Sequence, residues 1–264
     1  MEQKQLGEFK AWFDDYVAGF YGDDEFVNAN LKLKEKHSGR VVKEMRYLAD
    51  QLGLEANQRR IAEVVALFHD IGRFEQFVKY RTYSDIRSVS HSLLGIEVLR
   101  KTKILEAVDR KETELIEKAI EYHGNMELPA GLDDQCLLFS KLIRDADKID
   151  IFYVITTSYK QYKNDPVTFM LELELPDNPE YSDRVVDAIL NEQRIDYRSL
   201  KTSNDMKLCQ LGWVYDINFT AALKRIRQRR FLDILLEFLP STEDIEKVRE
   251  KIFSYVDRRI NTNS

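Results

Sequence analysis

Residues 66–74 read Ala-Leu-Phe-His-Asp-Ile-Gly-Arg-Phe, and this short stretch joins an apolar helical run to two polar side chains. Apolar residues recur at helical spacing before it, namely Ile61, Val64, Val65 and Phe68. This pattern predicts an amphipathic helix over about residues 57–71, ended by Gly72 as helices often are. His69 and Asp70 then lie in its last turn, where a buried carboxylate is costly unless it is paired or binds a cation.

Helical periodicity continues on both sides of this stretch and predicts an all-α fold. Further helices are expected over residues 8–20, 30–52, 91–99, 113–123, 133–159 and, in several pieces, 183–260. Residues 73–90 carry too few periodic signals and are expected to form a loop with short turns. The whole chain of 264 residues has only 10 Gly and 5 Pro, which is few for an all-β protein whose turns need them.

One domain boundary is expected, where prolines interrupt the helical pattern. Pro166, Pro176 and Pro179 fall within residues 164–181. We therefore predict a first domain over residues 1–163 and a C-terminal helical extension over residues 164–264.

Composition and charge limit the classes of protein to which this chain can belong. About 44% of residues are hydrophobic and 33% charged, as in globular chains, and the net charge of −6 disfavours general nucleic-acid binding. The first residues lack the pattern of a secretory leader, and no apolar run approaches the roughly 18 residues of a membrane span. Cys136 and Cys209 are far apart and suit a reducing compartment. The expectation is a cytoplasmic protein without a membrane or nucleic-acid partner.

The histidines are the clearest chemical signal. The chain has four, and none follows residue 123: His37, His69, His91 and His123. Each lies at the end of a predicted helix or on its apolar face. A single histidine at such a position is most often a core residue with its hydrogen bonds satisfied. Four such histidines, with Asp70 next to one of them, are harder to explain in that way. Imidazole and carboxylate together suit a divalent transition metal.

The ordered set His37, His69-Asp70, His91, His123 and Asp147 resembles the HD-domain superfamily of metal-dependent phosphohydrolases. The local contexts are similar too: HSGRVVKEMRYLA, ALFHDIGRF, SVSHSLLGIEVL, AIEYHGN and RDADKIDIF. The resemblance covers about residues 30–155, and the ordered set is far more specific than the HDIGRF block alone. It implies an orthogonal helical bundle of the HD type, with the C-terminal extension packed on it.

The resemblance also implies the ligands. A first metal would be held by His37, His69, Asp70 and Asp147, and a second by His91 and His123, with Asp70 bridging the two as the catalytic carboxylate. Asp145 is the alternative to Asp147, because helical periodicity does not separate them. The expected cofactors are one or two divalent metals among Mn, Fe, Co, Ni and Zn, and Mg is also compatible.

The implied chemistry is hydrolysis of a phosphate ester by a metal-activated water. The expected partner is a small phosphorylated substrate, with a nucleotide as the first candidate, and a homodimer is compatible with the sequence. Lys148, Arg73 and Arg81 are the predicted phosphate contacts, Lys148 because similar lysines in the family bind phosphate. Asp150 and Glu121 are candidates for orienting the histidines.

Other interpretations stay open at this stage. A minority branch of the same superfamily uses a similar ligand set in diiron oxygenases, and a sensor would bind a nucleotide without turnover. Trp213 and Tyr215 are expected to pack in the core, with base stacking as the alternative. The five cations in residues 224–230 are most often a solvated helix face, and DNA binding through them ranks lowest.

Overall fold

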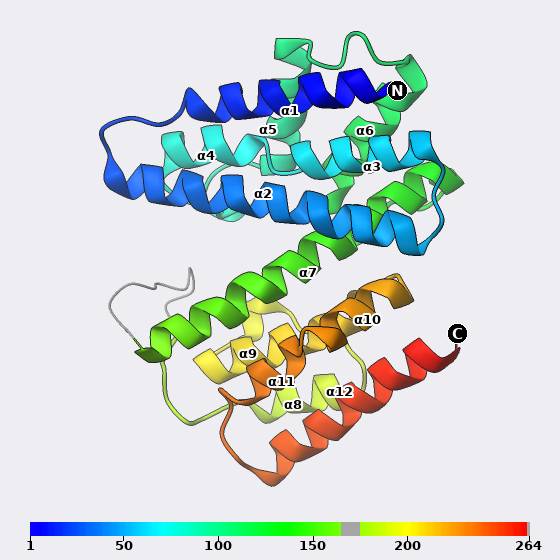
Figure 1. Ribbon diagram of the computed structural model, residues 1–264. Coiled ribbons are helices and arrows are strands. Elements are labelled where there is room, and N and C mark those ends of the chain that lie inside the picture. The colour runs from blue at the N-terminus through cyan, green and yellow to red at the C-terminus, as the bar shows by residue number, and fades with distance from the viewer. Residues whose placement is uncertain (165–174, 263–264) are drawn as a thin grey trace. The chain divides into compact units, whose positions relative to one another are not determined.

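The computed structural model describes residues 1–164 and 175–262, and helices are the regular secondary structure of those ranges (Figure 1). The α-helices are α1 (Gln3–Ala18), α2 (Glu25–Gln51), α3 (Ala56–Phe68), α4 (Gly72–Tyr80), α5 (His91–Thr102), α6 (Arg110–His123), α7 (Asp134–Asn164), α8 (Asp183–Leu190), α9 (Ser203–Gly212), α10 (Thr220–Gln228), α11 (Phe231–Leu236) and α12 (Glu243–Thr262). Short 3-10 turns are η1 (Asp85–Arg87), η2 (Tyr197–Ser199) and η3 (Trp213–Asp216). The all-α prediction is confirmed.

Two compact units make up the chain, Met1–Asp150 and Ile151–Ser264. The division falls within α7, earlier in the chain than the boundary expected at residues 163 and 164. Much of the expected seam at residues 164–181 lies outside the described residues. The domain limits drawn from the sequence therefore stay a prediction.

The loop expected over residues 73–90 is wrong in its first half, because α4 occupies Gly72–Tyr80. Phe74 and Phe77 are buried, and they pack against rings from elsewhere, Phe13 at 5.9 Å and Tyr83 at 4.5 Å between centroids. A helix of two turns is marginal by itself, so these tertiary contacts stabilise it. Its apolar pattern is too short to be recognised in the sequence.

In the first unit α3 lies at the centre, against α1, α2 and α6. Phe68, at its last turn, is fully buried and meets the rings of Phe9 and Trp12 edge-on at 5.9 Å and 5.7 Å. Burying a side chain of this size stabilises the fold by about 1.5–3 kcal/mol. The end of α3 is thus held firmly, and His69 directly follows it.

Side-chain caps determine where two other helices of this unit begin. The Asp24 carboxylate accepts the Val27 N–H at 3.0 Å at the start of α2, and the Asp109 carboxylate accepts the Lys111 N–H at 2.9 Å at the start of α6. Such caps satisfy amides that the helix itself leaves without acceptors, and each contributes about 0.5–2 kcal/mol. Both helices carry a candidate histidine, so the caps help set the register of the site.

The second unit packs α12 against α8 and α10, and α9 against α8 and α11. Trp213 meets Phe152 edge-on at 5.7 Å. The Tyr215 hydroxyl donates to the Ile189 carbonyl at 2.8 Å, and its ring contacts Tyr255. Both aromatic residues thus pack within the second unit, and whether either one contacts a substrate stays open.

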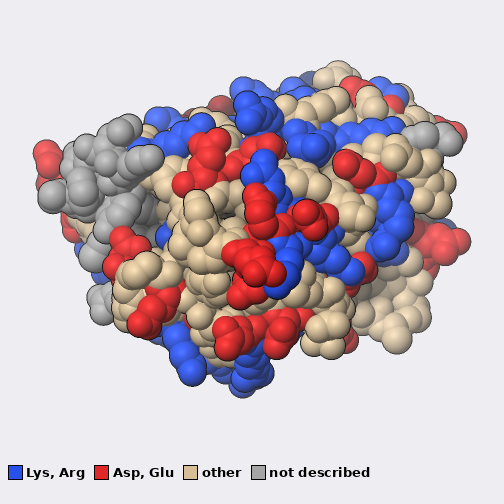
Figure 2. All heavy atoms as spheres, turned by 90° about the horizontal axis from the view of Figure 1, so that it is seen from below, with Lys and Arg blue, Asp and Glu red and all other residues tan. Residues whose placement is uncertain are grey.

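Charged side chains of both signs are interspersed on the face that Figure 2 shows. Within the basic segment 224–230, Arg227 lies 3.5 Å from Asp233 and 3.7 Å from Asp257. Such a mixed surface is typical of a solvated face. Among the described residues, no helix combines the length and apolar character needed to cross a bilayer.

Candidate metal centre

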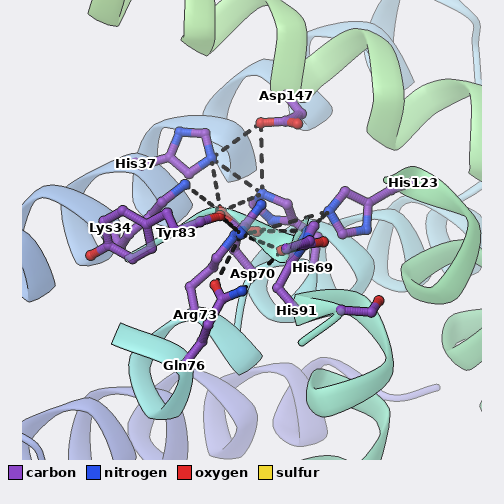
Figure 3. Close-up of polar contacts among 12 residues, drawn as sticks. Lys34, His37, His69, Asp70, Arg73, Gln76, Tyr83, His91, His123 and Asp147 are labelled. Atoms are coloured by element: carbon purple, nitrogen blue, oxygen red, sulfur yellow. Dashed lines mark hydrogen bonds and ion pairs between the residues drawn. The ribbon is translucent and has the colours of Figure 1, made fainter. Parts of the chain in front are cut away.

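Four helices and one connection between helices bring the predicted ligands to one place (Figure 3). His37 lies in the middle of α2, His91 opens α5 and His123 closes α6. His69 and Asp70 occupy the short connection between α3 and α4, and Asp147 lies in α7. The four histidines and Asp70 are buried.

Asp70 lies between two pairs of histidines. Its Oδ2 atom is 3.5 Å from Nε2 of His37 and 3.7 Å from Nε2 of His69. Its Oδ1 atom is 3.5 Å from Nε2 of His91 and 3.8 Å from Nε2 of His123. One carboxylate therefore presents a different oxygen to each pair, as a bridging ligand does.

The Nε2 atoms converge within each pair, 3.2 Å apart for His37 and His69 and 3.0 Å for His91 and His123. Asp147 completes the first pair, with Oδ1 at 3.1 Å from His37 and 3.8 Å from His69. Three overlapping groups have donor atoms close enough to share an ion: His37, His69 and Asp70; His69, His123 and Asp147; Asp70, His91 and His123. Asp147, and not Asp145, is the residue of α7 in these groups.

Each imidazole is hydrogen-bonded through its other nitrogen. Nδ1 of His69 lies 2.8 Å from the Ala66 carbonyl, and Nδ1 of His123 lies 2.6 Å from the Ile120 carbonyl. A carbonyl only accepts, so both Nδ1 atoms carry a proton. Nε2 of each ring is then the nitrogen that could bind a metal.

Carboxylates orient the other two histidines. Nδ1 of His37 lies 2.6 Å from Asp150 Oδ2, and Nδ1 of His91 lies 2.6 Å from Asp85 Oδ2. Asp150 is held in turn by Arg40, whose Nε donates to Oδ1 at 2.6 Å. Carboxylate–imidazole pairs of this kind raise the basicity of a ligand and hold its ring in place.

The sequence interpretation named Asp150 but missed Asp85. Asp85 lies in η1, within the stretch expected to be a loop. Nothing in the local pattern distinguishes it from a surface residue, and its six-residue separation from His91 matches no helical spacing. Only the fold of the segment between α4 and α5 brings the two side chains together.

The comparison with protein families matches this same part of the chain, residues 35–151, to the model described as HD domain. Residues 35–151 are an HD domain. The family consists mostly of metal-dependent phosphohydrolases, and the matched residues include all six predicted ligands. The searches of curated proteins and of solved structures each found no match.

Burial and charge set the protonation of the HD site. Burial lowers the pKa of His69 to about 4 and that of His91 to about 4, so both rings are neutral at pH 7. Burial alone raises the pKa of Asp70, but Lys34, His69 and Arg73 outweigh it and hold that pKa well below its usual range. Two neutral imidazoles beside an ionised carboxylate are ready to bind a divalent cation.

His37 behaves differently. Burial and Lys34 lower its pKa, whereas the hydrogen bonds to Asp147 and Asp150 raise it and prevail. Without a metal, a proton on Nε2 of His37 would be shared with Asp147 at 3.1 Å. The two carboxylates beside His37 therefore favour its protonated form.

Two cations contact Asp70 directly. Lys34 Nζ lies 2.8 Å from Oδ2, and Arg73 Nε lies 3.3 Å from Oδ1 (Figure 3). Arg73 was predicted from the sequence as a phosphate contact, and that role stays a prediction. Lys34 was missed, although it precedes His37 by one helical turn on α2 and that spacing could have revealed it.

The other predicted phosphate contacts lie differently. Arg81 follows α4, and its half-exposed side chain pairs with Asp24 at 2.8 Å. Lys148 is partly exposed on α7, next to Asp147. The described contacts of Asp70 include neither Arg81 nor Lys148. The role of these two residues in binding substrate therefore stays a prediction.

Gly72 of the HDIG sequence is required by close packing. A Cβ atom at this position would lie 2.3 Å from the His91 carbonyl oxygen and 2.6 Å from the Gly95 amide nitrogen. Such distances are far below van der Waals contact, so only glycine lets α4 and α5 approach this closely. That approach brings His91 to Asp70.

Proposed function

We propose that this HD domain is a dinuclear metal-dependent phosphohydrolase that acts on a small phosphorylated molecule, with nucleotides as the first class to test. The observation that carries the proposal is the carboxylate of Asp70, whose two oxygens each face a different pair of Nε2 atoms. This arrangement fits two ions sharing one bridging ligand. The donor set of imidazole and carboxylate fits Mn, Fe, Co, Ni or Zn.

Bound divalent ions would supply a water activated for attack on phosphorus and would neutralise the phosphoryl oxygens. The protein residues have their own tasks. Asp70 sets the separation between two histidine pairs, His37 with His69 and His91 with His123. Asp147 lies beside the pair of His37 and His69. Asp85 and Asp150 hold their histidines in the ligating tautomer.

The test is hydrolysis by protein purified without chelators, with its metal content measured. Mn²⁺, Fe²⁺, Co²⁺, Ni²⁺ and Mg²⁺ would each be added to chelator-treated protein, with p-nitrophenyl phosphate esters and a panel of nucleotides as substrates. Asp70→Ala removes the bridging ligand, and Asp50→Asn is a matched control because its carboxylate forms an exposed ion pair with Arg59, away from the predicted ligands.

We expect metal-dependent phosphate release that falls at least about 1,000-fold in Asp70→Ala, since loss of a shared ligand removes most of the metal contribution. Asp50→Asn should keep wild-type activity. Close to two metal ions per chain would support the dinuclear form. Bound iron with oxygen uptake and no phosphate release would favour a diiron oxygenase, and nucleotide binding without turnover would favour a sensor.

A further inference from the structure

Lys34 occupies an unusual place for a lysine. Its side chain is 17% exposed and its ammonium lies 2.8 Å from Asp70 Oδ2, the oxygen that faces His37 and His69. Within the described part of the chain, that oxygen is its one hydrogen-bond acceptor, and the ring of Tyr83 lies 5.2 Å away. The Tyr83 hydroxyl donates to the Asn30 carbonyl at 2.8 Å, which holds the ring beside the lysine.

Arg73, on the other oxygen of Asp70, is held much more firmly. Besides Asp70, its guanidinium donates to Gln76 at 2.9 Å, to Asp85 at 2.8 Å and to the Tyr83 carbonyl. A planar guanidinium with this many partners cannot turn without losing several of them. Lys34 has a flexible stem and a single acceptor, so of these two cations it is the one free to move.

Lys34 competes with a metal for Asp70. A divalent ion bound by His37, His69 and Asp70 Oδ2 would place two cations on one carboxylate oxygen, and their repulsion in a buried site is strong. The ammonium would have to turn away from Oδ2. A partly buried ammonium without an acceptor is itself costly, so it needs another anion close by.

We propose that Lys34 is an exchangeable cation: it neutralises Asp70 in the metal-free protein and binds the phosphoryl group of the substrate once a metal has taken Asp70. This inference rests on the proposed phosphohydrolase function and assigns the phosphate contact of that site. The ligand class is a phosphate monoester or a terminal phosphate, whose extra negative charge an ammonium recognises best. Metal loading then prepares the site for an anionic substrate.

The experiment compares Lys34→Met, Lys34→Arg and wild type in two binding measurements. Mn²⁺ is titrated into chelator-treated protein by calorimetry, and inorganic phosphate is then titrated into the Mn²⁺-loaded protein. Lys32→Met is the matched control, because Lys32 lies on the same helix, is half-exposed and pairs with Glu35 instead of Asp70. Thermal melts check that every variant folds.

For Lys34→Met we expect Mn²⁺ to bind more tightly and phosphate more weakly. Each change should be about tenfold or more, given the 1.5–3 kcal/mol typical of a hydrogen bond to a charged group. Lys34→Arg keeps the charge and should retain most of the phosphate affinity, and Lys32→Met should match wild type in both titrations.

The two opposite shifts in Lys34→Met are both required. Mn²⁺ binding that is unchanged or weaker would overturn the inference, and so would unchanged phosphate binding. Hydrolysis is a separate measurement. If both shifts appear and no phosphate ester is cleaved, the role of Lys34 stands and the proposed hydrolase function fails.

Discussion

At the scale of single residues, the orientation of each imidazole depends on the group that accepts a hydrogen bond from its Nδ1 atom. His69 and His123 each use a backbone carbonyl three residues earlier in their own helical turn. His37 and His91 instead use carboxylates, Asp150 and Asp85, from other elements. The rings of His69 and His123 are therefore oriented locally, whereas those of His37 and His91 depend on tertiary contacts.

Removing a supporting carboxylate should weaken metal binding without removing a ligand. We expect Asp85→Ala and Asp150→Ala each to lower metal affinity by about 10–100-fold, because His91 or His37 loses the partner of its Nδ1 proton. Competition with a fluorescent chelator measures this, with Asp50→Asn as control. Wild-type affinity in both variants would contradict the assigned roles of these carboxylates.

At the scale of elements, the contact between α4 and α5 decides whether the two halves of the site meet. Gly72 opens α4 directly after the connection that carries Asp70, and its backbone touches the first turn of α5. The histidine of that turn is His91. Any side chain at residue 72 would therefore push His91 away from Asp70.

Gly72→Ala should damage both stability and metal binding. A methyl group 2.3 Å from a backbone oxygen must move the helices apart, and overpacking of this kind costs about 1–3 kcal/mol. Urea unfolding measures the free energy of unfolding. Mn²⁺ titration should show loss of the metal binding that depends on His91.

Gly39→Ala is the control, because a Cβ at this position in α2 meets nothing within 4 Å. Alanine there should stabilise the protein by about 0.5–1 kcal/mol. Equal effects of the two substitutions would argue against the packing explanation.

At the scale of the whole molecule, the buried histidines couple the stability of the metal-free protein to pH. His69 and His91 have folded-state pKa values of about 4, against 6.5 for an unperturbed histidine. The unfolded chain therefore takes up protons between pH 7 and 4 that the folded chain refuses, and stability falls as pH falls through this window. The raised pKa of His37 has the opposite effect on stability, but it is a single group, whereas His69 and His91 both destabilise the folded protein on acidification.

Chelator-treated protein should therefore need progressively less urea to unfold at pH 6, 5 and 4.5 than at pH 7. Asp70, Asp85 and Asp147 all have lowered pKa values, so their contributions begin to be lost only below about pH 5, where unfolded carboxyls begin to bind protons. Saturating Mn²⁺ should raise the urea midpoint at pH 7, because the metal binds only the folded site. A midpoint that is constant or rises on acidification would contradict the protonation described for His69 and His91.

The amino-acid sequence by itself determined the helical class and the order of the ligands. Periodic apolar residues show which face of a helix is buried, and for that reason His37, His69 and His123 could be placed at buried positions. Asp147 could be chosen over Asp145 only through the family resemblance, since local periodicity favoured neither. The helices themselves were predicted to within a few residues at most ends, apart from α4, which is too short to show a period.

Only the tertiary structure decided how the side chains meet. That Asp70 presents one oxygen to each histidine pair, that Asp85 supports His91 and that Lys34 lies on Asp70 all depend on distances between separate helices. Local sequence encodes the direction in which a side chain points, but not the partner that packing brings to it. The candidate ligands, and Asp150 as an orienting group, could therefore be named from the sequence, whereas the contacts of Asp85 with His91 and of Lys34 with Asp70 depend on the tertiary structure.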